Sequence, residues 1–328
     1  MVVVVVNPNQ STHVPWVCIT FGTSEYMNAF SNKWAQNMVF KGGASAAAAF
    51  ERSDLSAPWQ GNGKKSFMFQ QHHCAYWAWH GDLLQKACEW IQTHAFECGL
   101  RACASIVVVY LDLDFRFEQN FHETINSWWN YIFCESTFLS FMVGEWSFKS
   151  RSVRSFTSPH VLDMIRTHWS MFRREVLSEE QWQTILSHPQ LLGGCLAFRF
   201  NVNGPNQSLD KYLTIYKSMC ENHTLISGGQ HRRQHRHNQS LWSLLMLHPE
   251  DDHEKQIITD PSQCGSRDPL LYMRISEGTD ASNLWRQCIL YRSPNVSFTW
   301  NTIQKLDALR KSRPLRGQIP LQELLNMS

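Results

Sequence analysis

Two aspartates, Asp112 and Asp114, follow the most apolar stretch of the chain at a spacing suited to binding a metal ion. The stretch from Ser105 to Leu113 is short and rich in valine, isoleucine and leucine, which predicts a strand buried on both faces in the middle of a sheet. Residues two apart on a strand share a face, and paired carboxylates there are costly unless a cation neutralises them. The pair therefore indicates a Mg²⁺ or Mn²⁺ site. The alternative is a solvated strand end, or pairing with Arg116 or a helix amino terminus.

A second motif, Ser158-Pro-His160, begins 44 residues after Asp114. Arg151 and Arg154 precede it, so its surroundings are polar and basic. Cationic and hydrogen-bonding side chains of this kind suit a triphosphate. The alternative for His160 is an ordinary loop histidine, because Pro159 is uncomfortable inside a strand.

A strand ending in Asp-x-Asp, followed by Ser-x-His, resembles the archaeo-eukaryotic primase superfamily, in particular its primase-polymerase and viral primase branches. The resemblance covers about residues 64–218 and includes Tyr216-Lys217-Ser218. It implies an α+β, RRM-like catalytic core in which Asp112 and Asp114 bind two divalent ions. His160 would contact the nucleotide phosphates, with Ser158, Arg151, Arg154 and Lys217 as further substrate contacts.

The family's third motif is an acidic residue at the end of a strand. In this sequence the matching region offers Asn201 or Asn203, and Asp210 is the nearby carboxylate that could substitute. The implied activity is a metal-dependent nucleotidyltransferase that acts on a nucleic-acid template with nucleoside triphosphates and a replication-protein partner.

The elements that must position these residues follow from hydrophobic spacing and turn residues. We expect a mixed sheet with flanking helices, which is an α+β architecture. The expected elements are a loop around one short helix over 41–65, a helix over Leu83–Phe96, helical or mixed segments over Glu123–Phe133 and Val161–Glu175, a capping box at Ser178 and Gln181, a strand over Cys195–Phe200 after Gly193-Gly194, a turn at Asn203–Asn206 with a return strand over Lys211–Ser218, and an exposed loop over Ser227–Gln239.

Three segments are expected along the chain. Residues 1–65 form an N-terminal segment and loop, residues 66–226 the catalytic-like core, and residues 227–328 a C-terminal region with a small zinc- or nucleic-acid-binding module. Cys220 and His223 have the spacing of zinc ligands, and Cys264 with Cys288 could complete four.

Composition bounds the remaining possibilities. The 328 residues are 43% hydrophobic and 18% charged, with a net charge of +2, which excludes a globally disordered chain and a strong overall field for polyanions. No signal peptide or membrane span is expected. The ten cysteines have no framework spacing, so reduced thiols in the nucleus or cytoplasm are expected.

Two other classes of protein remain open. A haloacid-dehalogenase-like phosphatase also begins with Asp-x-Asp, but Arg116 stands where that signature has Thr or Val. A non-enzymatic nucleic-acid-binding or structural protein would use the basic segments His231–His237 and Arg310–Arg316, with tryptophans that stack on bases. Core packing is the simpler interpretation of most tryptophans.

Overall fold

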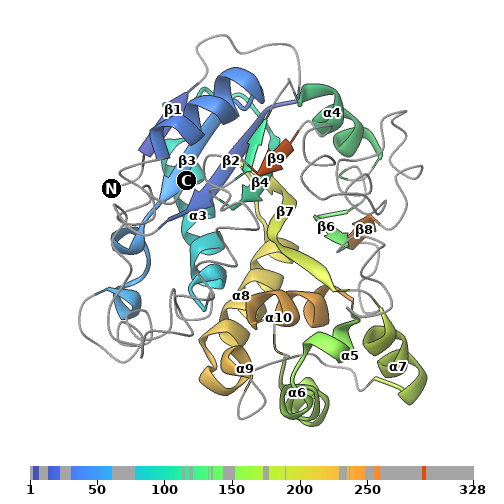
Figure 1. Cartoon of the computed structure of the whole chain (residues 1–328). Coiled ribbons are helices and arrows are strands. Elements are labelled where there is room, and N and C mark those ends of the chain that lie inside the picture. The colour runs from blue at the N-terminus through green and yellow to red at the C-terminus, as the bar shows by residue number, and fades with distance from the viewer. Residues whose placement is uncertain are drawn as a thin grey trace, which may run out of the picture.

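The fold is built around a seven-stranded sheet, shown in the computed structural model of Figure 1. The structure describes residues 3–6, 14–22, 31–60, 78–112, 115–117, 121–131, 133, 136–142, 152–172, 177–188, 190–228, 235, 237–247, 255–258 and 290–292. In sheet order the strands are β1 (Val3–Val6), β3 (Ala46–Phe50), β2 (Trp16–Phe21), β4 (Ser105–Leu111), β7 (Leu191–Asn201), β6 (Phe138–Met142) and β8 (Lys255–Ile258).

Strand β4 is the fourth of the seven, so the predicted central strand is confirmed. It is parallel to β2, which is parallel to β3, while β1 is antiparallel to β3. On its other side β4 is antiparallel to β7, which is antiparallel to β6, and β6 is parallel to β8. A separate two-stranded sheet pairs β5 (Phe115–Phe117) with β9 (Leu290–Arg292).

Helices pack against this mixed sheet, in agreement with the α+β architecture expected from the sequence. They are α3 (His80–His94), α4 (His122–Tyr131), α5 (Val153–Phe156), α6 (Pro159–Phe172), α7 (Glu179–Ser187), α8 (Gln207–Glu221), α9 (His223–Ser227) and α10 (His237–Met246). A π-helical turn covers Asn37–Lys41, and single 3₁₀ turns cover Arg52–Asp54 and Ala57–Trp59.

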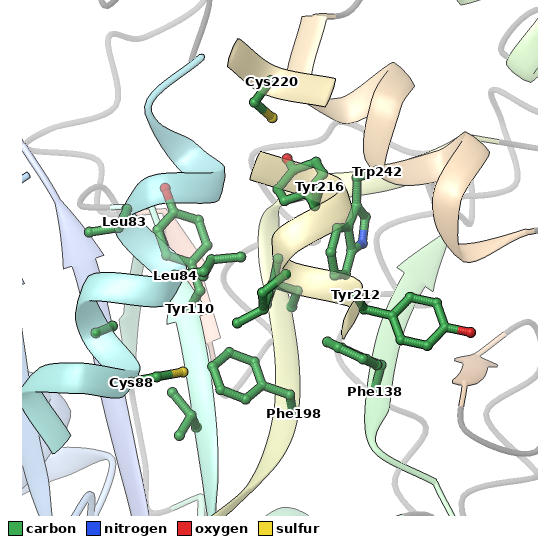
Figure 2. Close-up of a cluster of buried hydrophobic side chains, with 14 of the residues drawn as sticks. Leu83, Leu84, Cys88, Tyr110, Phe138, Phe198, Tyr212, Tyr216, Cys220 and Trp242 are labelled. Atoms are coloured by element: carbon green, nitrogen blue, oxygen red, sulfur yellow. The ribbon is translucent and has the colours of Figure 1, made fainter. Parts of the chain in front are cut away.

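The two faces of β4 bury two separate apolar clusters, because successive side chains of a strand point to opposite sides. Ile106, Val108 and Tyr110 belong to the cluster that includes α3, α8 and α10. Figure 2 shows part of this layer, with Leu84 from α3, Tyr216 from α8 and Trp242 from α10. Val107, Val109 and Leu111 belong to the second cluster, with Trp16, Trp34 and Trp128.

The predicted return strand over Lys211–Ser218 is wrong, because this segment lies inside helix α8. The buried residues of α8 recur at intervals of three and four, which is the period of a helix face; they are Leu209, Tyr212, Leu213, Tyr216, Met219 and Cys220. The expected strand over residues 211–218 includes only some of these buried positions, so the helical period is visible only over the whole of α8.

Two predicted loops are also partly wrong. Within 41–65, Ala46–Phe50 is the fully buried strand β3, although alanine has a weak preference for strands. Within Ser227–Gln239, His235 and Asn238 are buried and α10 begins at His237. By contrast, the predicted capping box forms at the start of α7, where Ser178 and Gln181 satisfy each other's backbone N–H groups.

Strands from all three predicted segments join the same sheet. Residues 1–65 contribute β1, β2 and β3, and the segment that begins at residue 227 contributes β8. The carboxyl end of β4 is therefore supported by neighbours from distant parts of the chain.

Candidate active site at the carboxyl end of the central strand

Asp112 is the first residue after β4, and the structure fixes both its backbone and its side chain. Its N–H donates to the carbonyl oxygen of Gly194 at 2.9 Å. The Tyr110 hydroxyl donates to Asp112 Oδ1 at 2.9 Å. Asp112 is half-buried whereas Tyr110 is only 1% exposed. The carboxylate therefore stands at the edge of the sheet on a buried hydroxyl support.

Gly194 of the neighbouring strand β7 lies directly against this carboxylate. A Cβ atom added at Gly194 would lie 2.2 Å from Asp112 Oδ2 and 2.8 Å from Asp112 Cγ. Both distances are far below a van der Waals contact, so only glycine leaves the carboxylate where it is. At the adjacent Gly193, an added Cβ would meet the Gln239 side chain of α10 at 3.2 Å.

Beneath Tyr110 lies a buried polar pair from two helices. His80 Nδ1 of α3 is 2.9 Å from the Tyr216 hydroxyl of α8, and that hydroxyl also donates to the Asn238 carbonyl oxygen at 3.3 Å. The His80 ring packs edge-on against Tyr110, with 4.5 Å between centroids. Burial lowers the pKa of His80 to about 3, so the imidazole is neutral at neutral pH. The support beneath the carboxylate carries no charge.

The Ser158-x-His160 motif is divided between the interior and the surface. Ser158 is fully buried just before α6, and its N–H donates to His235 Nδ1 at 3.4 Å. His160 lies exposed in the first turn of α6. Burial lowers the pKa of His235 to about 4, with a further contribution from nearby His237. The buried histidine of this region is thus His235, which the sequence interpretation assigned to an exposed loop.

The start of α10 connects the Ser158 region to the edge of the sheet. His235, which contacts Ser158, precedes α10 by two residues, and Asn238 in its first turn accepts from Tyr216. The same turn packs on Gly193, next to the glycine that contacts Asp112. His235 thus contacts Ser158, and the first turn of α10 contacts Gly193. Arg151 and Asp114 lie outside the described residues.

Two of the predicted phosphate contacts have protein partners. The Arg154 guanidinium donates to Gln183 of α7 on the surface. Lys217 Nζ lies 2.6 Å from Asp82 Oδ1, in an ion pair between α8 and α3. Asp82 is fully buried, and it also accepts from the N–H and hydroxyl of Ser56.

The three candidates for a third metal ligand lie toward the other end of β4. Asn201 pairs with Ser105 at the start of β4, whereas Cys195 pairs with Leu111 at its end. Six residue steps separate the two pairs, which is about 20 Å along the strands. Asn203 donates to carbonyl oxygens of Arg101 and Cys103, before β4 begins.

Asp210 lies in the first turn of α8, a few residues after Asn203. Its pKa is raised by partial burial. None of the three candidates is placed at the Asp112 edge.

The candidate zinc ligands differ in exposure. Cys220 is fully buried beside Tyr216, and burial raises the pKa of its thiol to about 12. His223 is exposed at the start of α9. Cys264 and Cys288 lie outside the described residues. Within the described ranges, no three His, Cys, Asp or Glu side chains come together as a metal site.

Features proposed for a non-enzymatic role are largely internal where they are described. Trp79 and Trp128 are each 2% exposed, which supports core packing rather than base stacking. His235 is buried, and the basic segment Arg310–Arg316 is outside the described residues. In the part of the chain that is described, no helix has the length and apolarity to cross a bilayer.

Comparison with known proteins adds little to this geometry. No family model and no curated protein matches the chain. Among solved structures, the apo form of mouse xyloside xylosyltransferase 1 is similar at a TM-score of 0.34 and 12% identity, over 75% of this chain and 85% of that one. A similarity this low supports no conclusion about fold or activity.

Sequence reasoning located Asp112 but missed the residues around it. Tyr110 precedes Asp112 by two positions and so shares its face, a signal that was present in the spacing. The sequence shows Gly194 only as part of a Gly-Gly pair between expected elements, which does not indicate a contact with Asp112. His80 and Tyr216 are brought to Tyr110 only by the crossing of α3 and α8, which no local pattern encodes.

Proposed function

We propose that this chain is a metal-dependent transferase that binds the phosphates of a nucleotide substrate at the carboxyl end of β4. The observation that supports this most strongly is the Asp112 carboxylate, held at the edge of the sheet by Tyr110 and kept accessible by Gly194. Ligands of open sheets with parallel strands bind outside the carboxyl ends of those strands, where the strand order reverses. Strand β4 has parallel strands from earlier in the chain on one side and later strands on the other.

Asp112 fits a divalent ion in both chemistry and placement. It offers hard carboxylate oxygens, which Mg²⁺ and Mn²⁺ prefer, and it is half-buried rather than enclosed. Asp114, two positions further along the sequence, would be the second ligand. A bound ion would neutralise charge on the phosphate oxygens as the leaving group departs. The protein's own part is to orient the carboxylate through Tyr110.

Within this class, glycosyl transfer from a nucleoside-diphosphate sugar is one candidate, because it needs fewer metal ligands than nucleotidyl transfer needs. Nucleotidyl transfer commonly uses two metal ions about 3.5–4 Å apart, which need oxygen ligands beyond one aspartate pair. The candidates for those ligands, Asn201, Asn203 and Asp210, lie toward the other end of β4. A departing nucleoside diphosphate can be neutralised by a single ion held by two carboxylates and its own phosphates.

Nucleotidyl transfer to a nucleic acid, as implied by the primase resemblance, is the second candidate. It is favoured by the connection through α10 between the Ser158 region and the edge that carries Asp112. In that reaction the exposed His160 would act near the triphosphate, the buried Ser158 would hold the start of α6, and a nucleic-acid template would be the partner.

Calorimetry with the full chain tests the class of protein. Mn²⁺-dependent binding of nucleoside diphosphates is expected in wild type. It should weaken at least tenfold in the double variant Asp112→Asn/Asp114→Asn, with unchanged circular dichroism and melting temperature. The double variant Asp163→Asn/Glu180→Gln, at exposed positions of α6 and α7, is the matched control for loss of two acidic charges. Equal binding by wild type and the double variant would exclude the proposal.

The identity of the released product separates the two reactions. Glycosyl transfer releases nucleoside diphosphate from a nucleotide sugar, whereas nucleotidyl transfer releases pyrophosphate from a nucleoside triphosphate on a primed template. Salt-sensitive nucleic-acid binding that is indifferent to Asp112 and Asp114 would instead support the non-enzymatic alternative.

A further inference from the structure

Tyr110 is a buried side chain that holds the Asp112 carboxylate in a set direction. The two residues are two positions apart and share a face of the chain, so the hydroxyl reaches Oδ1 at 2.9 Å without crossing the sheet. Tyr110 is 1% exposed, so this hydroxyl is shielded from competing water. A shielded donor limits the rotation of the carboxylate at the strand end.

The Tyr110 ring is itself held in place. On the α3 side its neighbour is His80, at 4.5 Å between ring centroids and an interplanar angle of 70°. His80 is fixed in turn by the Tyr216 hydroxyl, and Tyr216 by the backbone of Asn238. Helices α3, α8 and α10 thus each contribute to the placement of one hydroxyl group.

The backbone of Gly194 also lies against the carboxylate. Gly194 accepts from the Asp112 N–H at 2.9 Å, and a Cβ at Gly194 would come within 2.2 Å of Oδ2. Any larger residue would push the carboxylate away from its present position. The Gly194 backbone and the Tyr110 hydroxyl therefore both restrict the position of Asp112.

We infer that Tyr110 is a positioning residue for a divalent-cation ligand, and that Gly194 is the position that lets that ligand occupy its site. The inference rests on the proposed function and adds to it the residues that orient Asp112. Partners that orient a metal ligand commonly change metal affinity by 10–100-fold when they are removed.

The test measures Mn²⁺ binding to the 328-residue chain by calorimetry and by the electron paramagnetic resonance signal of free Mn²⁺. Tyr110→Phe removes only the hydroxyl, so the dissociation constant should rise about tenfold while the metal-free melting temperature changes little. Tyr212→Phe removes a hydroxyl from the same layer on the side of Phe138 and should leave Mn²⁺ affinity within twofold.

The two adjacent glycines give a second, steric comparison. Gly194→Ala should abolish Mn²⁺ binding, whereas Gly193→Ala, whose new methyl would lie 3.2 Å from Gln239 Cβ and away from the carboxylate, should retain it. Mn²⁺ binding by wild type that Tyr110→Phe leaves unchanged would overturn the inference alone. Absence of Mn²⁺ binding by wild type would overturn the proposed function, and the inference with it.

Discussion

Lys217 Nζ lies 2.6 Å from Asp82 Oδ1, and this ion pair joins α8 to α3. The lysine side chain is 25% exposed, but the aspartate side chain is fully buried. Removal of one partner from a buried pair leaves the other charge without compensation. The geometry therefore gives Lys217 a role in holding the two helices together, in place of the phosphate contact implied by the primase resemblance.

Replacement of Lys217 should lower stability more than substrate binding. We expect Lys217→Met to reduce the free energy of unfolding by about 3 kcal/mol, measured by urea denaturation. Nucleotide affinity of the folded variant should stay within twofold of wild type. Lys211→Met, at an exposed position of the same helix, is the control and should change stability by less than about 1 kcal/mol. Full stability with lost nucleotide affinity would restore the phosphate-contact prediction.

Asp210 gives a direct test of the third carboxylate. Because it lies in the first turn of α8, beyond the end of β7, Asp210→Asn should leave the Mn²⁺ dissociation constant within twofold of wild type. Asp112→Asn should raise it at least tenfold. Calorimetric titration of both variants under the same conditions makes the comparison. A tenfold loss in Asp210→Asn would place this residue at the metal and favour the nucleotidyl-transfer candidate.

The parts of the fold that could be predicted are those that a local pattern determines. The run before Asp112 is apolar at every position, so its burial on both faces follows from sequence alone. The capping box at Ser178 is likewise a local contact. Strand β3 could not be predicted in this way, because alanine is depleted in strands and the segment becomes a strand through its pairing with β1 and β2 from earlier in the chain.

The candidate site shows the same division between local and distant determinants. Asp112 could be proposed from the sequence because its carboxylate follows an apolar strand. His80, Tyr216 and Gly194 were missed because each is brought to the site by pairing or helix crossing over a long sequence separation: His80 and Tyr216 are 136 residues apart. Nothing in the local sequence around these residues indicates a role, because their contacts form only in the assembled fold.

Buried His80 should make the fold sensitive to acid. Its pKa in the folded protein is about 3, below the value near 6.5 of an unfolded chain. Between these values the unfolded state binds the extra proton, so stability is complete above about pH 6.5 and decreases as the pH falls toward 3. One such group contributes a slope of up to ~1.4 kcal/mol per pH unit.

The phenylalanine variant isolates this contribution. His80→Phe keeps an aromatic ring and removes the titration, so its unfolding free energy should fall less steeply than that of wild type between pH 6.5 and 4.5. His235, whose pKa is lowered to about 4, remains in both proteins and accounts for the residual slope. Urea titrations at intervals across this range measure the difference. Equal slopes would mean that His80 does not stay neutral in the folded state.

Gly81 marks the closest approach of α3 to α8, and its replacement tests whether that approach is rigid. A Cβ at Gly81 would lie 2.5 Å from the Cα and 2.9 Å from the backbone nitrogen of Lys217. Backbone atoms cannot move aside as a side-chain end can, so the helices would have to separate. Replacing glycine by alanine inside a helix normally raises the free energy of unfolding by about 1 kcal/mol, whereas overpacking lowers it by about 1–3 kcal/mol.

The sign of the change in unfolding free energy in Gly81→Ala therefore shows whether helix propensity or overpacking dominates. We expect a net loss of unfolding free energy of about 1–2 kcal/mol, measured by urea denaturation, because separation of the helices also lengthens the Lys217–Asp82 pair. Gly204→Ala, where the nearest atom is the Asn201 Cβ at 3.8 Å, is the control with room for a methyl group. A net gain of stability in Gly81→Ala would show that α3 and α8 can move apart at little cost, and His80 would then be a weaker support for Tyr110 than its contacts indicate.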